Sequence, residues 1–422
     1  MWQLTGNPLF QQKSILQFHE RFGIPNSCIC NIVALVFWPG FNRQFLMALK
    51  FFLLAGEASG DMHGANLAKA LKEARPDIIL HGWGGPKMKS AGVVLHRELK
   101  DLSFMGFVEV LKNIGTIHKN FKLIKTLLNE WRPDALVLID YPGFNLKIAK
   151  WAHRQGIKVF YFISPTVWAW KANRALIIKE SVDRLYCILP FEVNFYKKLN
   201  YDVTYVGNPL SDPVSAFIPN PHFQSSHPFN NQEYIAALPG SRNQELIKIF
   251  PVMVRTMALM PEQHFVIART SLLPEEAFVS VLEQYYPNWR NRVFIATDQT
   301  YDVLYHAHSA MVTSGTATLE TALFHIPQVV CYSTNPINYH IAKSFVNIKY
   351  ISLVNLIPDK AIVTELIQAD LTPENLKKEL IKLEDNSPQR SRILEDYQLL
   401  AMIVGEAGVS ERMAKDMLQR MG

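Results

Sequence analysis

Three side chains that can bind hydroxyl groups or accept protons follow the first strongly apolar run of the chain. Glu57, Ser59 and Asp61 come directly after Phe51–Ala55. The apolar run predicts a buried strand, and the residues after Gly60 predict a helix. Open α/β folds bind ligands at such a strand–turn–helix junction. The turn lacks the lysine of a phosphate loop and matches neither common glycine-rich nucleotide motif, so those motifs do not explain it.

A further acidic side chain, Asp140, ends a second apolar run and precedes Tyr141-Pro-Gly-Phe-Asn145. A partly desolvated carboxylate at the C-terminal end of a strand can take the proton of an attacking hydroxyl group. The same residue can instead cap the next helix or begin a turn, as aspartate often does. The residues alone leave both interpretations open.

Two loops in the second half of the chain indicate an anion site. The first is Leu238-Pro-Gly-Ser-Arg242, which follows a predicted strand and opens a predicted helix. Gly240 and Ser241 can present backbone N–H groups there, and Arg242 adds a guanidinium fork suited to phosphate.

The second loop, Ser314-Gly-Thr-Ala-Thr-Leu-Glu320, also begins a predicted helix. Ser314, Gly315 and Thr316 lie where a helix points free N–H groups at an anion. Glu320 lies about one turn further along, where a carboxylate can accept hydrogen bonds from ribose hydroxyls. Helix capping is the alternative explanation, because Ser and Thr are common at helix starts. Two such loops after neighbouring strands favour a nucleotide diphosphate site.

From Lys50 onward, short apolar runs alternate with helical patterns, and the alternation occurs twice. The first set of predicted strands is 50–55, 78–82, 135–140, 158–163, 184–189 and 203–206, with helices at 61–74, 107–131, 144–155, 172–182 and 191–199. The second set is 234–238, 264–269, 292–296, 309–313 and 328–332, with helices at 243–259, 274–285, 316–325 and 336–345. Such alternation predicts parallel sheets covered on both faces. We therefore predict two doubly wound α/β domains whose strand ends face a cleft.

The predicted domain limits follow from these patterns. They are a first domain at 47–218, a Pro-rich linker at 219–233, a second domain at 234–371, and charged C-terminal helices at 372–422 that can pack back on the first domain. Residues 1–46 show weak periodicity and no cleavage site. We interpret them as an extension of unknown role, or as translation from a start codon upstream of Met47.

Composition narrows the possible functions. The 422 residues carry a net charge of +6 and are 49% hydrophobic, which fits a globular protein and does not by itself identify a partner. The four cysteines show neither metal spacing nor a disulfide framework, so we expect a reducing compartment. No apolar run reaches the roughly 18 residues of a membrane span. No Asp-x-Asp metal–diphosphate clamp occurs, so we predict no metal and no cofactor, and a leaving group stabilised by Arg242 and a helix dipole.

The helix predicted at 107–131 has one apolar face with lysines among its residues. This face contains Phe107, Val110, Leu111, Ile114 and Ile117. An ordinary core helix explains the pattern. A basic helix that lies on an anionic membrane surface explains it as well, and burial of the apolar side chains would distinguish the two.

Seven motifs, in this order along the chain, resemble those of the lipid-A-disaccharide synthase family. They are Ala55-Gly-Glu-Ala-Ser-Gly-Asp61, Met105-Gly106 with Glu109, Ile139-Asp-Tyr-Pro-Gly-Phe-Asn145, Ser164-Pro-Thr-Val-Trp-Ala-Trp170, Leu189-Pro-Phe-Glu192, Leu238-Pro-Gly-Ser-Arg242 and Ser314-Gly-Thr-Ala-Thr-Leu-Glu320. The resemblance runs from about Leu49 into the C-terminal tail. The chain departs from the family at Gly143, where the family usually has a second acid, so Asp140 is the only carboxylate of its loop.

The resemblance implies a GT-B glycosyltransferase built from two Rossmann-like domains. Such an enzyme transfers 2,3-diacylglucosamine from UDP to the 6-hydroxyl of 2,3-diacylglucosamine 1-phosphate (lipid X), with inversion at the donor carbon. Asp140 is then the expected base, with Glu57 as its rival. Arg242 and residues 314–316 are expected to hold the diphosphate, and Glu320 the ribose.

The acceptor side is expected to include Gly56, Ser59, Asp61 and Asn145, because an acidic turn suits a ligand rich in hydroxyl groups. Both substrates implied by the resemblance carry acyl chains. The expected location is therefore cytoplasmic, at the periphery of the inner membrane of a Gram-negative-type bacterium. The expected partners are UDP-2,3-diacylglucosamine, lipid X and an anionic membrane surface, with a homo-oligomer left open and no nucleic acid.

Two alternatives belong to other functional classes. A UDP-sugar 2-epimerase shares the two-domain fold but needs no acceptor. A non-enzymatic basic protein that binds membranes or nucleic acid would explain the charge but not the loops at the strand ends, and it predicts no affinity for UDP.

Overall fold

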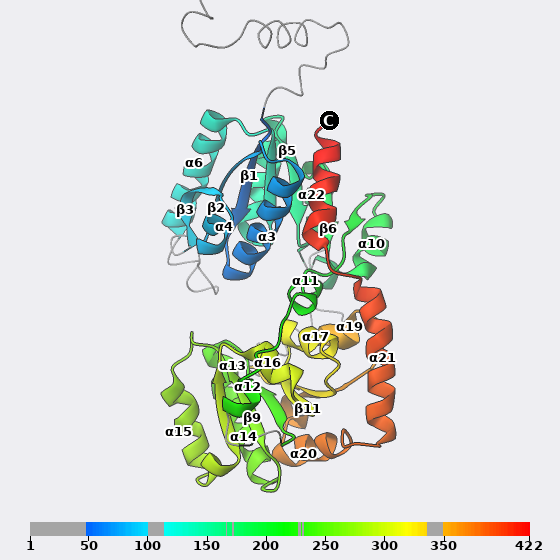
Figure 1. The fold of residues 1–422 in the computed structure, drawn as a ribbon. Helices are drawn as coiled ribbons and strands as arrows, with labels where there is room; N and C mark the ends of the chain where they lie inside the picture. Colours follow the sequence, from blue (N-terminus) through cyan, green and yellow to red (C-terminus); the bar gives the residue numbers. More distant parts are fainter. Residues whose placement is uncertain are drawn as a thin grey trace, which may run out of the picture. The chain divides into compact units, whose positions relative to one another are not determined.

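The computed structural model describes residues 48–99, 114–165, 167–170, 173–226, 229, 232–335 and 349–422. Residues 50–421 form one compact unit that contains two separate parallel sheets (Figure 1). The two sheets confirm the predicted doubly wound α/β class. Within the described residues, no helix has both the length and the apolar character needed to cross a membrane.

The first sheet has seven parallel strands in the order β3-β2-β1-β4-β5-β6-β7. Its strands are β1 (Lys50–Ala55), β2 (Ile79–Gly84), β3 (Val94–Glu98), β4 (Ala135–Ile139), β5 (Lys158–Phe162), β6 (Arg184–Cys187) and β7 (Thr204–Tyr205). All five residues of β4 are buried, as expected for a parallel strand covered on both faces. The register sets Ala55 beside Ile139, so the loops after β1 and β4 leave the sheet next to each other.

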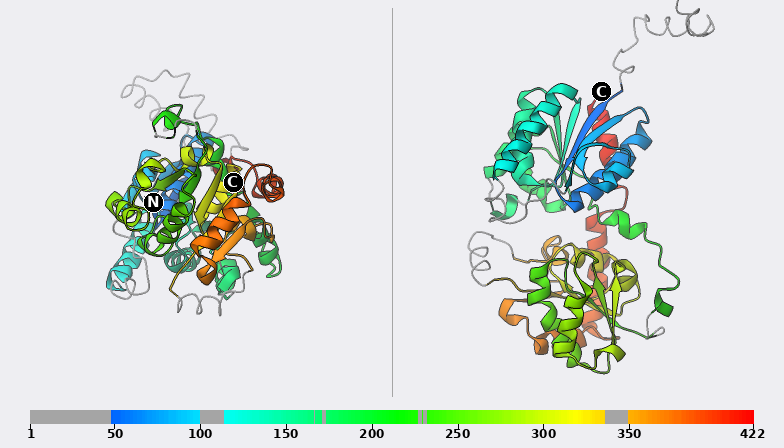
Figure 2. Two further views of the ribbon diagram at one scale, coloured as in Figure 1. Left: turned by 90° about the horizontal axis from the view of Figure 1, so that it is seen from below. Right: turned by 90° about the vertical axis from the view of Figure 1, so that its left-hand side faces the viewer.

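Helices cover both faces of this sheet. They are α3 (Ala58–Ala74), α4 (Pro86–Ser90), α6 (Ile114–Trp131), α7 (Pro142–Arg154), α8 (Val167–Trp170), α9 (Asn173–Ser181), α10 (Pro190–Lys197) and α22 (Val409–Arg420). Figure 2 shows α3 and α22 on one face and α6 on the other. The last helix is bound to the sheet as well as to α3, because the Tyr186 hydroxyl donates to Asp416 Oδ2 at 2.7 Å.

The second sheet has six parallel strands in the order β10-β9-β8-β11-β12-β13. Its strands are β8 (Ile235–Leu238), β9 (Phe265–Arg269), β10 (Val293–Thr297), β11 (Ser309–Thr313), β12 (Gln328–Tyr332) and β13 (Thr364–Ile367). Its helices are α13 (Asn243–Lys248), α14 (Phe250–Ala258), α15 (Glu275–Tyr285), α16 (Thr300–Tyr305), α17 (Thr316–Leu323), α19 (Leu353–Leu356), α20 (Pro373–Ile381) and α21 (Pro388–Val404). Leu238 pairs with Val312, so the loops after β8 and β11 also leave the sheet side by side.

Two short helices, α11 (Ser211–Ser215) and α12 (Phe223–Ser226), lie in the chain between the two sheets. The buried face of α21 belongs to the core of the second sheet, through Ile393, Tyr397, Leu400 and Val404. The chain then turns at Gly405 and Gly408, which both have positive φ, before α22 packs on α3.

The edge strands β3 and β13 were not predicted. Side chains of β3 alternate between exposed and half-buried, and β13 buries only Leu366. An edge strand is covered less completely than a central one, so it needs no continuous apolar run. The single helix predicted at 243–259 is two helices that meet at Ile249, since Pro251 cannot continue the hydrogen-bond ladder of the preceding turn. The helix predicted at 336–345 lies outside the described residues.

Asp61 joins α3 to the start of α4. Its carboxylate accepts hydrogen bonds from the backbone N–H groups of Gly85 at 2.7 Å, Lys87 at 3.0 Å and Met88 at 3.0 Å. The side chain is 3% exposed. A buried carboxylate that satisfies three donors, two of them in the first turn of a helix, is a structural cap.

Asp61→Ala should therefore destabilise the fold. The substitution leaves three N–H groups of the 85–88 segment without their acceptor, at a cost of about 1–3 kcal/mol. Urea denaturation measures this loss. Ser59→Ala, on the exposed side of the same turn, is the matched control and should change stability little. Equal stability of the Asp61→Ala protein and the wild type would contradict the capping role.

Candidate active site

The loops that carry Glu57 and Asp140 are neighbours because β1 and β4 pair in parallel. Gly56 makes this close approach possible. A Cβ atom at Gly56 would lie 2.4 Å from Cγ of the Tyr141 ring, a distance that no side chain can accept. Glycine therefore lets the first loop pack directly on the aromatic ring that follows Asp140.

An unusual turn presents Asp140. Both Asp140 and Tyr141 have positive φ, +45° and +51°, a conformation that costs energy for residues other than glycine. Two side chains hold the turn through the Asp140 carbonyl oxygen. Asn145 Nδ2 donates to it at 2.7 Å, and the Tyr161 hydroxyl donates to it at 2.7 Å. Since both bonds use the backbone, they fix the turn without neutralising the carboxylate.

The surroundings of Asp140 make its carboxylate more basic than usual. Burial raises the pKa of Asp140 to about 6, and the negative charge of Glu57 acts in the same direction. A hydrogen bond from the Tyr141 backbone opposes the shift. A carboxylate with a pKa near 6 is still ionised at neutral pH, and it accepts a proton more readily than an exposed aspartate does.

The residues predicted for the acceptor side have different roles in the structure. Ser59 is exposed and Glu57 is half-buried at the start of α3, so both can meet a ligand. Asp61 is occupied by the three N–H groups of the 85–88 segment, and we withdraw it from the acceptor side. Asn145 is fully buried and holds the Asp140 turn. It positions the site without facing it.

The two predicted anion-binding loops of the second half meet at one small cavity of about 130 Å³. Its lining includes Arg242 from the first loop and Ser314 from the second. Lys248, Tyr332 and Thr334 also line it and were not predicted. The sequence carries a signal for Lys248, because Arg242, Glu245 and Lys248 follow one another at the three-residue spacing of one helical face.

Backbone N–H groups of the first loop are already occupied. Glu245 Oε2 accepts from Ser241 N at 3.0 Å and from Arg242 N at 3.1 Å. Gly240 has φ +99°, and a Cβ atom there would lie 2.1 Å from the same oxygen. The Ser241 N–H is therefore not free as expected, and the role of the Gly240 N–H stays a prediction. The guanidinium of Arg242 stays accessible, with its side chain 74% exposed and Nη1 3.6 Å from Glu245 Oε1.

In the second loop the backbone of Ser314 is also used, because its N–H donates to the Cys331 carbonyl at 3.0 Å and its hydroxyl to the Ile351 carbonyl at 3.1 Å. Gly315 and Thr316 are exposed at the start of α17. Among the described residues, no group accepts from their N–H groups. These two positions retain the donors expected at a helix N-terminus.

Glu320 lies on α17 with a partner that the sequence did not reveal. The Tyr301 hydroxyl donates to Glu320 Oε1 at 2.8 Å. Burial raises the pKa of Glu320, and this hydrogen bond opposes the rise. The Tyr301 ring packs against Phe324 and Phe217, with ring centres 5.1 and 5.6 Å apart. No local pattern predicts Tyr301, because it reaches Glu320 from another helix.

One group of possible metal ligands occurs in the described residues, away from these loops. Side-chain atoms of Glu233, His308 and Asp385 lie within 4.8 Å of one another. Glu233 and His308 precede β8 and β11, so they lie at the N-terminal ends of these strands, whereas the two loops follow the C-terminal ends. The same Asp385 Oδ1 atom already pairs with Arg390 Nε at 3.4 Å and with His308 Nε2 at 3.2 Å. We assign no metal to the group.

The predicted membrane face lies mostly in a segment outside the described residues. Phe107, Val110 and Leu111 lie outside the described residues, as does the side chain of Ile114. Ile117, on α6, is half-buried. The proposed contact with a membrane surface therefore stays a prediction.

Comparison with known proteins identifies relatives along most of the chain. A family model described as lipid-A-disaccharide synthetase matches residues 51–417. Lipid-A-disaccharide synthase of Geobacter metallireducens is 34% identical over 378 residues, which cover 88% of this chain and 97% of the relative. The enzyme of the same name from Coxiella burnetii is 34% identical over 364 residues, covering 86% of this chain and 96% of the relative.

Solved structures share the fold at low sequence identity. UDP-GlcNAc 2-epimerase from Neisseria meningitidis, bound to UDP-GlcNAc, has a TM-score of 0.61 at 13% identity and covers 88% of this chain and 100% of its own. The glycotransferase of kitacinnamycin has a TM-score of 0.59 at 14% identity, covering 89% and 99%. At this identity the likeness concerns the fold alone.

Asp140→Asn should stabilise the protein at pH 8 and change its stability little at pH 4. The pKa of the folded-state carboxyl is raised from 3.8 to about 6, so the wild type loses stability as the pH rises through this window. The expected gain at pH 8 is on the order of 1–3 kcal/mol, and asparagine tolerates the positive φ. Urea denaturation at both pH values measures it. An equal gain at pH 4 would show that ionisation is not the cause.

Proposed function

Since this chain belongs to the lipid-A-disaccharide synthetase family, we propose that it is an inverting glycosyltransferase of lipid A biosynthesis. The donor is UDP-2,3-diacylglucosamine and the acceptor is lipid X, 2,3-diacylglucosamine 1-phosphate. The products are the β-1,6-linked disaccharide 1-phosphate and UDP. The family match over residues 51–417 supports this proposal, and relatives named lipid-A-disaccharide synthase are matched over nearly their whole length.

The reaction is a single displacement in this proposal. The acceptor O6 attacks the anomeric carbon of the donor, the bond from that carbon to the UDP oxygen breaks, and the configuration inverts. The O6 proton passes to Asp140. The observation that carries this role is the position of Asp140 at the end of β4, beside Glu57, with a pKa raised to about 6. Glu57 remains the rival base, because it belongs to the adjacent loop.

The leaving UDP carries the negative charge that develops in the reaction, and the second half of the chain supplies cations for it. Arg242 and Lys248 line the cavity at the loops after β8 and β11. The N–H groups of Gly315 and Thr316 add the positive end of α17. Glu320 binds the ribose hydroxyls, oriented by Tyr301. Fixed positive groups of this kind stabilise a departing diphosphate.

We also propose that the enzyme acts at the cytoplasmic face of an anionic inner membrane, because both substrates carry acyl chains that do not dissolve in water. The basic excess of the chain, +6, favours such a surface. The apolar residues expected to meet the membrane begin at Phe107. Association into a homo-oligomer is compatible with the proposal, which does not depend on it.

Because UDP-GlcNAc 2-epimerases share this fold, the proposed transferase activity must be distinguished from an epimerase activity. The transferase should release UDP from UDP-2,3-diacylglucosamine only when lipid X is present, and it should leave unacylated UDP-GlcNAc unchanged. UDP release and product formation can be followed in mixed micelles, with and without lipid X. Release that does not require the acceptor would contradict the proposal.

Asp140→Asn should lower kcat by about 10²- to 10⁴-fold, the usual contribution of a positioned base. The affinity for UDP should stay near that of the wild type, because the residues proposed to bind the nucleotide lie in the other half of the chain. Near-normal turnover of this variant would point to Glu57 instead.

The dependence of kcat on pH also distinguishes Asp140 from Glu57 as the base. The wild-type profile should fall below a pH of about 6, and Glu57→Gln should move this fall to lower pH, since it removes a like charge near Asp140.

Tyr301→Phe should raise KM for the donor several-fold and change kcat little, because Glu320 loses the hydrogen bond that orients it. That bond also lowers the pKa of Glu320. Donor binding by the variant should therefore weaken at a higher pH than in the wild type. Tyr305→Phe is a matched control on the same helix, since Tyr305 is 53% exposed. Equal effects of the two substitutions would argue against the role of Tyr301.

A further inference from the structure

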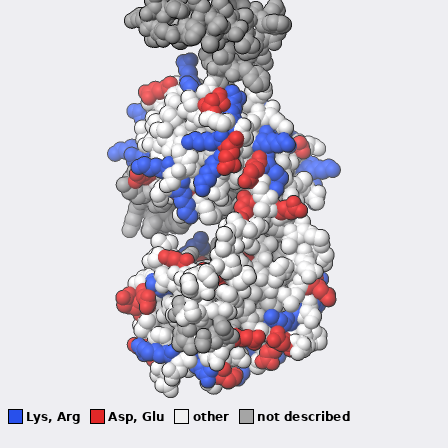
Figure 3. Space-filling model, in the orientation of Figure 1, with Lys and Arg blue, Asp and Glu red and all other residues white. Residues whose placement is uncertain are grey.

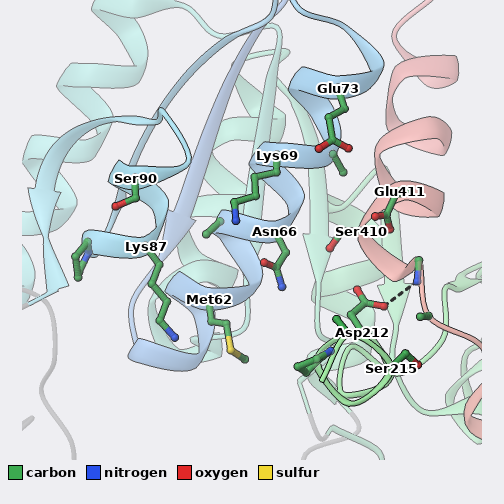
Figure 4. Close-up of a pocket in the computed structure, with 17 residues that line it drawn as sticks. Met62, Asn66, Lys69, Glu73, Lys87, Ser90, Asp212, Ser215, Ser410 and Glu411 are labelled. Carbon is green, nitrogen blue, oxygen red and sulfur yellow. Dashed lines mark hydrogen bonds between the residues drawn. The ribbon is translucent and has the colours of Figure 1, made fainter. Parts of the chain in front are cut away.

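A groove of about 930 Å³ runs along one side of α3 (Figure 4). The residues that α3 contributes are spaced by three and four positions, so they form a single stripe of the helix. They are Met62, Ala65, Asn66, Lys69, Ala70 and Glu73. The other walls come from α4, α11 and the start of α22. Its volume lies in the range of small-molecule sites.

The wall opposite α3 is held rigidly. Asp212, on α11, accepts from the N–H groups of Gly408 at 2.8 Å and Val409 at 3.2 Å. The Arg412 guanidinium donates to the carbonyl oxygens of Val206, Glu406 and Ala407. The groove is therefore formed before any ligand arrives, which lowers the entropy that binding must lose.

The wall formed by α3 and α4 offers donors. Lys69 and Lys87 line it, together with Asn66 and Ser90, and Figure 4 shows these four side chains along the two helices. Among the described residues, no carboxylate forms an ion pair with either lysine. Two ammonium groups, an amide and a hydroxyl are the groups that bind a phosphate.

The remaining polar side chains of the lining are carboxylates and serine hydroxyl groups. Glu411 and Ser410 come from α22, and Glu73 from the far end of α3. Asp212 is occupied by its two N–H donors. Acidic and basic side chains also lie close together over this face of the first domain in Figure 3. A ligand that fits both walls needs an anionic group for the lysines and hydroxyl groups for the carboxylates.

We propose that this groove binds a phosphorylated polyol of the sugar phosphate class, with its phosphate at Lys69 and Lys87 and its hydroxyl groups at Glu73 and Glu411. The groove begins next to the acceptor turn, because its lining residue Met62 follows Asp61, and it extends away from that turn along α3. Lys69 follows Ser59 by ten residues on α3, which is about 15 Å along the helix. One sugar ring that reaches Asp140 cannot also place its phosphate at Lys69. The groove shares no lining residue with the cavity at Arg242.

Isothermal titration calorimetry with glucose 1-phosphate, at saturating UDP so that the donor site is filled, tests the proposal. Glucose 1-phosphate should bind more tightly than inorganic phosphate, and glucose should not bind measurably. Lys69→Met and Lys87→Met should each weaken binding about tenfold or more. Lys89→Met is the matched control, because it removes the same charge from exposed α4 outside the groove, and it should leave the affinity unchanged.

Two outcomes would overturn the proposal. Equal weakening by Lys89→Met would mean that general surface charge attracts the phosphate. A rise in KM for lipid X in Lys69→Met, in step with the lost affinity, would mean that the phosphate belongs to the acceptor. Cosedimentation with phosphatidic acid vesicles then identifies the source of the phosphate. Binding that depends on Lys87 but not on Lys89 would show that a lipid headgroup also enters, and its absence would restrict the groove to soluble ligands.

Discussion

The parallel pairing of β1 with β4, in the register that sets Ala55 beside Ile139, is the constraint on which the first half of the site depends. Two loops that are more than eighty residues apart in the sequence therefore lie side by side at the C-terminal ends of these strands. A shift of this register by one residue would reverse the face of every side chain in the strand. The pairing of Leu238 with Val312 does the same for the two loops of the second sheet that are predicted to bind an anion.

Acidic residues perform two opposite tasks in this structure. Asp61, Asp212 and Glu245 each accept hydrogen bonds from two or more backbone N–H groups, and so they fix loops and helix starts. Asp140 and Glu320 lie near loops that are proposed to bind ligands, and burial raises their pKa values. Asp61 accepts hydrogen bonds from backbone N–H groups. In contrast, the surrounding protein compensates the negative charges of Asp140 and Glu320 only incompletely.

The central strands could be predicted from the sequence because the apolar runs that form them are local, and the site residues at their ends were proposed from equally local patterns. Buried strands need apolar runs, and a turn after a strand is visible in its glycines and prolines. The edge strand β3 escaped prediction because its exposed residues need not be apolar. The capping role of Asp61 depends on Gly85, 24 residues away, and the role of Tyr301 depends on Glu320, so neither could be inferred from neighbours in the sequence. Glu245 differs, because its bonds to Ser241 and Arg242 form a local capping arrangement that the spacing could have revealed.

The proposed reaction requires a basic group at the attacking hydroxyl and positive charge at the departing diphosphate, and the two sheets separate these requirements. Burial and Glu57 raise the pKa of Asp140, and among the described residues no cation counteracts them. A guanidinium beside Asp140 would lower its pKa and make it a poorer proton acceptor. Glu245 also lines the cavity at Arg242, but its carboxylate accepts from the Ser241 and Arg242 N–H groups and pairs with the Arg242 guanidinium. Asp140 on the first sheet, and Arg242 with Lys248 on the second, therefore each keep the electrostatic surroundings that their own task needs.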